Sequence, residues 1–432
     1  TMLGMMVNAI YNLVDAYFVG GLGTSQMGAI SVVYPLGQVV VGLGLLFGNG
    51  AASYLSRLLG NGDKEKADKV ASTALYSSIT VGAIMIIFSV IFLQPILKLL
   101  GATDSIMPYA ITYASIYIVS CIFNVFNVTM NNIVTSEGAA KTTMLALMAG
   151  AILNIGLDPV FIYVLDMGVA GAAIATAISQ IVSTLVYLTF VLRKKSVYNF
   201  KIKNCTFTKE IMSEIFKIGI PTLVFQILTS LSISLVNTQA RPYGDSVIAG
   251  MGAVTRVVSM GSLMVFGFIK GFQPIAGYSY GAKKFDRLHE AIKTSIIWST
   301  VFCVIYGLVL TVFSKGIISQ FTKGDLEMIR VGTQSLRING ISFILFGFYT
   351  VYSSLFLALG KGLAGFILGA CRQGICFVPV ILILPMFWGI NGILYVQPIA
   401  DVLSAIITIF MALHLHQELD VTKQKFLSEK AG

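Results

Sequence analysis

Long apolar runs separated by short polar segments make up almost all of this chain. Twelve of them reach the length of about 20 residues that a helix needs to cross a bilayer. The breaks between them carry turn residues, for example Gly60-Asn-Gly62, Glu137-Gly138 and Gly360-Lys-Gly362. The pattern predicts an all-α membrane protein with twelve transmembrane helices. The runs lie at roughly 1–20, 29–57, 70–97, 108–134, 142–164, 168–192, 213–239, 246–276, 290–313, 333–359, 363–386 and 393–415.

The composition excludes an ordinary soluble domain. Of the 432 residues, 56% are hydrophobic and 11% are charged, whereas a soluble domain carries about 25% charged residues. The net charge of +10 comes mostly from lysines and arginines in the short connections. That distribution is typical of membrane topology and not of nucleic-acid binding. The five cysteines are scattered, and four lie in apolar runs, so they suggest neither a disulfide framework nor a zinc site.

The side of the membrane on which the basic residues lie predicts the orientation. Alternate connections hold most of the lysines and arginines, and the opposite set holds few. Because the basic side of a membrane protein is cytoplasmic, we expect both termini inside the cell and a multi-pass protein of the cell membrane. The basic set comprises Arg57, Lys64, Lys66, Lys69, Lys141, Arg193, Lys194, Lys195, Lys201, Lys203, Lys209, Lys283, Lys284, Arg287, Lys361 and the tail residues Lys423, Lys425 and Lys430.

The two halves of the chain resemble each other. Gly60 and Gly281 lie 221 residues apart in similar loops, and Gly168-Val-Ala-Gly171 matches Gly389-Ile-Asn-Gly392 at the same offset. Since each half holds six spans, the repeat is parallel, which places a central pathway between two lobes. The alternative is that glycine-containing turns recur by chance. We therefore expect an N-lobe at 1–192 (helices 1–6), a cytoplasmic linker at 193–212, a C-lobe at 213–416 (helices 7–12) and a cytoplasmic tail at 417–432.

The first apolar run carries a carboxylate. Asn8, Tyr11 and Asp15 are spaced i, i+3 and i+7, so they share one face of the predicted helix. A carboxylate at membrane depth is costly and is rarely kept unless it faces a protein interior or a wet cavity. We therefore expect Asp15 to be functional.

Three further helices of the first half carry polar stripes. A second carboxylate, Asp158, lies one turn after Asn154 and at a depth similar to that of Asp15. Pro159 follows it and should free the carbonyl oxygen of Ile155, which would suit a cation or a water. Two carboxylates in one apolar cavity should not both ionise unless a cation neutralises them, which predicts a proton or sodium switch. The alternative is that each aspartate is a structural cap. The other stripe residues are Ser120, Asn124, Asn127 and Asn131 in helix 4 and Thr176, Ser179 and Ser183 in helix 6.

The second half lacks these carboxylates, because Val236 and Pro379 stand at the matching places. The coupling site is therefore expected in the first half. Arg256 lies deep in an apolar run with no partner evident from the sequence, whereas Lys270 and Arg372 are expected to snorkel or pair. Asp401 follows Pro398 near a helix start and suits a helix cap or a ligand. No phosphate-binding loop or histidine cluster is present, so we expect neither an enzyme nor a cofactor.

These motifs together resemble the multidrug and toxic compound extrusion (MATE) family over essentially the whole chain. The resemblance implies a two-lobed, twelve-helix antiporter that expels cationic organic compounds in exchange for Na+ or H+. It further implies a first-lobe cation network of Tyr11, Asp15, Asn154, Asp158 and Thr176, with the two aspartates holding the metal if Na+ is the ion. The motifs are Tyr11-Asn-Leu-Val-Asp15-Ala-Tyr-Phe-Val-Gly20, Ser56-Arg-Leu-Leu-Gly60-Asn-Gly-Asp63, Leu153-Asn-Ile-Gly-Leu-Asp158-Pro159, Gly168-Val-Ala-Gly-Ala-Ala173 and Gly277-Tyr-Ser-Tyr-Gly-Ala-Lys-Lys284.

The additional polar network is expected to include Asn8, Asn127 and Asn131, of which Asn131 resembles the helix 4 asparagine of the family. Two other functions stay open. One is a flippase for lipid-linked oligosaccharides with a related fold, and the other is a channel or receptor, which needs no coupled carboxylates. The expected partners are small amphipathic substrates and the lipid bilayer, and the protein is expected to be a monomer.

Overall fold

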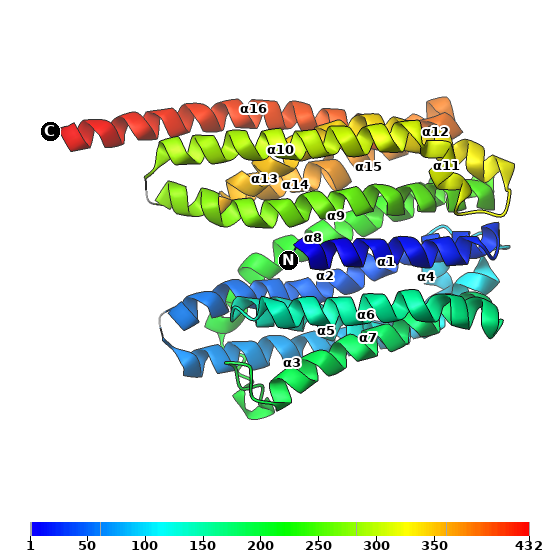
Figure 1. Cartoon of the computed structure of the whole chain (residues 1–432), viewed down its shortest axis with the longest axis horizontal. Helices are drawn as coiled ribbons and strands as arrows, with labels where there is room; N and C mark the ends of the chain where they lie inside the picture. The colour runs from blue at the N-terminus through cyan, green and yellow to red at the C-terminus, as the bar shows by residue number, and fades with distance from the viewer. Residues whose placement is uncertain (1, 61, 282, 360, 432) are drawn as a thin grey trace. The chain divides into compact units, whose positions relative to one another are not determined.

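The structure is a computed structural model that describes residues 2–60, 62–281, 283–359 and 361–431. Within these ranges it is helical and contains no strand (Figure 1). The elements are α1 (Met2–Gly20), α2 (Thr24–Gly60), α3 (Lys64–Ile91), α4 (Leu93–Leu99), α5 (Met107–Ser136), α6 (Ala140–Pro159), η1 (Val160–Val164), α7 (Gly168–Leu192), η2 (Ile202–Asn204), α8 (Lys209–Ala240), η3 (Arg241–Tyr243), α9 (Asp245–Gly281), α10 (Phe285–Val312), α11 (Ser314–Ser319), α12 (Leu326–Ser342), η4 (Phe343–Leu345), α13 (Phe346–Ala358), α14 (Gly362–Ala370), η5 (Cys371–Ile375), α15 (Phe377–Trp388) and α16 (Ile390–Ala431).

The twelve predicted spans are confirmed. Among the described residues, eleven helices are long and apolar enough to cross a membrane, and α1 precedes them. Three of the predicted spans contain a 3-10 or π-helical interruption, and the predicted span 70–97 divides into α3 and α4. One continues from α6 into the π-helix η1, one joins α12 to α13 through η4, and one joins α14 to α15 through the π-helix η5.

Local sequence explains where several helices begin and end. Asp63 caps α3 by accepting a hydrogen bond from the backbone N–H of Lys66, and Thr208 caps α8 in the same way through Ile211. Gly138, which follows α5, has a φ of +86°, a left-handed conformation that glycine adopts without strain. Residues 61, 282 and 360, in three of the predicted breaks, lie outside the described residues.

The chain packs into two compact units. The first holds residues 3–256 and 318–329 and the second holds residues 257–317 and 330 onward. In the first unit, small residues let α2 and α8 approach closely. A side chain at Gly50 would meet the carbonyl of Ile215, and one at Gly219 would meet the carbonyl of Leu46, so both positions require glycine. The expected division into lobes at residues 193–212 stays a prediction.

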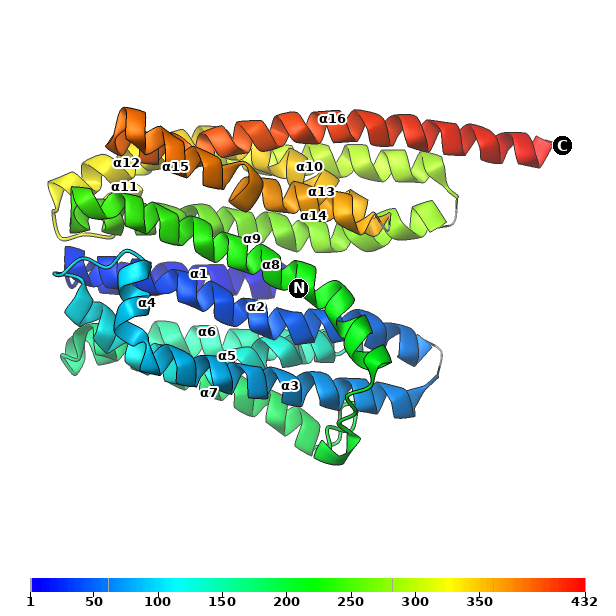
Figure 2. The ribbon, with the colours of Figure 1, turned by 180° about the vertical axis from the view of Figure 1, so that it is seen from behind.

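The segment between α7 and α8 is tied to the first unit by two carboxylates. Glu137 accepts hydrogen bonds from the hydroxyl of Ser196 and the backbone N–H of Val197, and Asp68 accepts two from Asn199. Figure 2 shows this segment beside the ends of α3 and α7. Burial raises the pKa of Glu137, since its carboxylate leaves water when it takes these bonds.

The second unit has an aromatic core. The rings of Phe343 and Phe346 stack with their centroids 5.0 Å apart, and Tyr306 and Tyr349 pack against this pair. These side chains come from α10, η4 and α13, so they join α10 to the broken span that contains η4 and α13. The core forms one wall of the polar cluster described below.

Candidate functional site

The carboxylate of Asp15 lies inside the first unit and not in lipid. Its residue is 5% exposed. The atom Oδ1 has no hydrogen-bond partner among the described residues, and Oδ2 lies 4.0 Å from Nη1 of Arg256. A buried carboxylate oxygen without a partner is costly, so this side chain has the capacity to bind a proton or a cation.

Arg256 is the partner of Asp15 that sequence reasoning missed. Its guanidinium reaches the backbone oxygens of Asn12 and Ile30, each at 3.4 Å, and its Cζ lies 5.1 Å from the centre of the Tyr34 ring. These contacts place a positive charge beside Asp15. The hydrogen bonds are long, so the guanidinium is held loosely.

Asp158 and its neighbours form the second part of the site. Asn154 donates to Oδ1 of Asp158 and to the hydroxyl of Thr176, each at 3.4 Å. Asp158 is fully buried and Asn154 nearly so. Two further oxygens, Oδ2 of Asp158 and Oδ1 of Asn154, have no hydrogen-bond partner within the described part of the chain. Directly after this cluster the backbone changes from α-helical to π-helical, because α6 ends at Pro159 and the π-helix η1 begins at Val160.

The two aspartates belong to one electrostatic cluster. Asp15 lies close enough to Asp158 for the two carboxylates to interact. The hydroxyls of Tyr11 and Tyr113 interact with Asp15, and that of Tyr113 also interacts with Asp158. The predicted residues Tyr11, Asp15, Asn154, Asp158 and Thr176 therefore lie in the same region of the first unit, and Tyr113 is an addition from α5.

The donor set fits a hard cation or a proton. Unpartnered oxygens of Asp15, Asn154 and Asp158 are carboxylate and amide oxygens, the ligand types that hard cations prefer. No group of three or more histidine, cysteine, aspartate or glutamate side chains gathers around a metal position in the described part of the chain. A cation here would therefore use two carboxylates with neutral oxygens, and Asn154 and Thr176 are placed to supply these.

The additional polar residues bind α7, the helix that also carries Thr176, but away from the two aspartates. Asn127 donates to the backbone oxygen and side-chain oxygen of Gln180 and accepts from Thr184. Asn131 donates to the hydroxyl of Tyr187. Both asparagines thus join α5 to α7, and their hydrogen bonds do not involve either aspartate. The side chain of Asn8 lies outside the described residues, as does that of Lys270.

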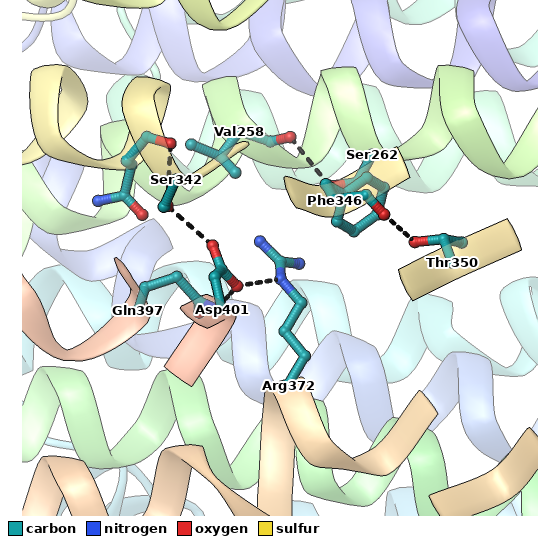
Figure 3. A network of polar contacts seen from close by, with 9 residues as sticks. Val258, Ser262, Ser342, Phe346, Thr350, Arg372, Gln397 and Asp401 are labelled. Carbon is teal, nitrogen blue, oxygen red and sulfur yellow. Dashed lines mark hydrogen bonds and ion pairs between the residues drawn. The ribbon is translucent and has the colours of Figure 1, made fainter. Parts of the chain in front are cut away.

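A separate charge pair lies in the second unit (Figure 3). Asp401 is not a helix cap, because it lies eleven residues beyond the start of α16 and its carboxylate binds side chains. It accepts from Nε of Arg372 at 2.9 Å, from Gln397 at 2.9 Å and from Ser342 at 2.8 Å. The expectation that Arg372 would pair or snorkel is resolved in favour of pairing.

Twelve apolar spans with a buried carboxylate cluster define a multi-pass membrane transporter, and three comparisons place it in a family. The MatE family model matches residues 1–160 and 221–383. The chain is 31% identical over 429 residues to the multidrug export protein MepA of Staphylococcus saprophyticus and over 428 residues to MepA of Staphylococcus aureus. In both cases 99% of this chain and 94% of the relative are covered. The chain therefore belongs to the MATE family of multidrug efflux transporters.

Solved structures agree with this assignment. An inward-facing multidrug resistance MATE transporter is 26% identical, with a TM-score of 0.89 over 95% of each chain. An outward-facing one, also 26% identical, has a TM-score of 0.78 over 97% of this chain and 94% of that chain. The predicted family, helical fold and location in a membrane are confirmed.

Proposed function

We propose that this protein is an antiporter that exports organic, often cationic, compounds in exchange for Na+ or H+. The relatives are multidrug export proteins, which supports the substrate class. The observation that carries the coupling is the cluster of Asp15 and Asp158 with three unpartnered buried oxygens. A proton or a sodium ion would neutralise this cluster, and a neutral cluster favours a different conformation from a charged one.

The proposed cycle is alternating access. A cation that enters from outside neutralises Asp15 and Asp158 and favours the conformation that releases the exported compound. When the cation leaves to the inside, Arg256 again supplies the charge beside Asp15, and a new substrate molecule binds. The ion and the substrate are coupled because each favours a different conformation. We further propose that both termini are cytoplasmic and that the protein acts as a monomer.

The test is dye efflux from proteoliposomes with Na+ and pH gradients imposed separately. Asp15→Asn and Asp158→Asn should abolish gradient-driven ethidium export while both variants still fold. The matched control is Asp166→Asn, an exposed aspartate just beyond η1, which should retain export. Full export by both site variants would overturn the proposed site. Flux that does not saturate would favour a channel, and transport of lipid-linked oligosaccharide without ethidium export would favour a flippase.

A further inference from the structure

The second unit contains a pocket that the proposed transport cycle does not use. Its volume is about 690 Å³, which lies within the range of small-molecule sites in proteins. It is enclosed by α12, the end of α15 and the beginning of α16, which meet at one end of the unit (Figure 2). The pocket is lined by Gln334, Trp388, Asn391, Tyr395 and Ile399.

The pocket lies where two transmembrane spans leave the apolar layer. The helix α15 ends at Trp388 and α16 begins at Ile390, so Asn391 lies at the turn between them and Tyr395 lies one helical turn deeper. The rings of Trp388 and Tyr395 meet edge to face, with their centroids 6.2 Å apart. Tryptophan and tyrosine are enriched at membrane interfaces, because each combines an apolar ring with a polar N–H or O–H group. The pocket is therefore at the level of the lipid headgroups.

A basic side chain lies beside the pocket. Arg337 follows Gln334 by three residues on α12, so the two side chains share one face of the helix. Its Nε donates to Oγ of Ser314 at 2.9 Å. Because Ser314 lies two residues beyond the end of α10, the guanidinium of Arg337 also lies near the membrane interface. Arg337 and Lys315 are both exposed, so this end of the unit presents positive charge to a ligand.

The segments that meet at the pocket carry little negative charge. The sequence contains no aspartate or glutamate at 291–323 or at 377–400. The only acid of α12 is Glu327, which precedes Arg337 by ten residues and thus by about 15 Å along the helix axis. On α16, Asp401 already accepts hydrogen bonds from three side chains. The charge distribution therefore favours an anion.

Large apolar side chains next to the pocket face outward. Met386 and Phe387, the two residues before Trp388, are 81% and 78% exposed. Exposed apolar side chains of this size mark a surface that contacts membrane or a partner, and at the end of a transmembrane span that surface faces lipid. An acyl chain that lies along Met386 and Phe387 leaves its headgroup at the pocket.

We propose that this pocket binds the headgroup of an anionic phospholipid that carries hydroxyl groups, a class represented by phosphatidylglycerol. Arg337 binds the phosphate, because a guanidinium donates parallel N–H groups that match phosphate oxygens. The amides of Gln334 and Asn391 bind the headgroup hydroxyls. Basic residues near a membrane surface recognise anionic lipids in the same way. The inference goes beyond the proposed function and depends neither on the coupling ion nor on the exported compound.

The test uses the two tryptophans of the chain as reporters. Trp388 lines the pocket, whereas Trp298 lies on α10 with 62% of its surface exposed and reports ordinary contact with lipid. Trp298→Phe leaves Trp388 as the only tryptophan, and Trp388→Phe leaves Trp298. Each full-length variant is reconstituted in phosphatidylcholine vesicles that contain a small fraction of either brominated phosphatidylglycerol or brominated phosphatidylcholine. Bromine quenches tryptophan fluorescence at short range, so quenching reports the lipid beside each reporter.

Trp388 should prefer phosphatidylglycerol about fivefold, the effect of one basic residue near an anionic lipid, whereas Trp298 should favour neither lipid by more than about twofold. In the Trp298→Phe background, Arg337→Gln should abolish the preference and Arg337→Lys should retain most of it. Gln334→Leu should weaken the preference less than Arg337→Gln does. The control Arg193→Gln makes the same change at an exposed position of another connection and should leave the preference unchanged.

Four results would overturn the proposal. Equal quenching of Trp388 by the two lipids would exclude a specific lipid site, and the same preference at Trp298 would reduce it to general attraction of anionic lipid to the protein. Loss of the preference when glycerol phosphate is added to the buffer would assign the pocket to a soluble phosphate ester. Loss of the preference when ethidium is added would assign it to the exported compounds.

Discussion

Arg256 and Asp15 form a buried charge pair whose nearest nitrogen and oxygen lie 4.0 Å apart. This separation is too long for a hydrogen bond, although both side chains are almost fully buried. Arg256 is instead held by the backbone oxygens of Asn12 and Ile30. The guanidinium therefore neutralises part of the charge of Asp15 without occupying its oxygens, and a mobile cation competes with it.

Replacing Arg256 with glutamine should strengthen cation binding. The variant removes a positive charge near the cluster, so the affinity for the coupling ion should rise about tenfold, equivalent to about 1.4 kcal/mol. Sodium binding is measured by calorimetry over a range of pH, and efflux is measured in parallel. Export should slow, because the ion leaves the cluster less readily. The control Arg193→Gln makes the same change at an exposed position, and unchanged or weaker ion binding by the Arg256 variant would contradict this role.

Asn154 and Asn127 are matched buried amides that should behave differently. Asn154→Leu removes the donor to Asp158 and Thr176 and should weaken ion binding about tenfold. Asn127→Leu breaks the bonds to Gln180 and Thr184 and should lower the free energy of unfolding by about 1–3 kcal/mol, the cost of unpaired buried groups. Its ion affinity should stay unchanged. Calorimetry and chemical denaturation in detergent separate the two effects, and similar ion binding by both variants would exclude a direct role for Asn154.

The contacts within the site that could be predicted from the sequence are those between residues on one helix, because helical spacing determines which side chains lie close together. Asn154 and Asp158 are one turn apart on one helix, so their contact follows from periodicity. The pairing of Arg256 with Asp15 joins residues more than 240 positions apart, and no local pattern encodes such a contact. For Asp401, the nearby Pro398 suggested a helix start, but α16 begins at Ile390 and continues through the proline. Pro159 indicates the helix interruption at η1 in the sequence. The π-helix at Cys371–Ile375 has no proline directly before it, so the sequence offers no comparable indication there.

In the first unit, five hydroxyls bind two carboxylates at helix starts and in the connections between helices. Asp325 accepts hydrogen bonds from Thr24 and Ser246, and Asp245 accepts from Ser25, Thr103 and Ser105. We call these seven residues the hydroxyl clasp. It joins the segment 318–329 to elements distant in the chain.

The clasp should weaken in acid. Burial disfavours the charged form of Asp325, but hydrogen bonds from Thr24, Ser246 and the backbone N–H groups of Met328 and Glu327 outweigh it and hold the pKa of Asp325 below its ordinary value. A lowered carboxylate pKa stabilises the folded state above the unfolded pKa of about 4, and that contribution is lost as pH falls through the folded pKa. Hydrogen exchange of residues 318–329, corrected for the intrinsic pH dependence of exchange, should therefore accelerate below about pH 4.

Substitution of Asp325 tests the same point at neutral pH. Asp325→Asn should raise exchange of residues 318–329 at pH 7 and should remove most of the acid-dependent increase. Asp104→Asn, at an exposed position nearby in sequence to the clasp residues, serves as the control and should leave exchange unchanged. If hydrogen exchange of residues 318–329 were equally slow in both variants, Asp325 would contribute nothing to the stability of the clasp.

The basic connections predict which ends of the helices face the cytoplasm, and labelling of single cysteines tests this. In a cysteine-free background, Asp104→Cys and Lys201→Cys place thiols at two exposed positions, the first between α4 and α5 and the second between α7 and α8. An impermeant maleimide should label position 104 in intact cells and position 201 only after permeabilisation, since lysines and arginines concentrate on the cytoplasmic side. The segment 193–203 carries five of them. Labelling of position 201 in intact cells would reverse the orientation and place the cluster of Asp15 and Asp158 nearer the inner face, which is incompatible with cation entry from outside in the proposed cycle.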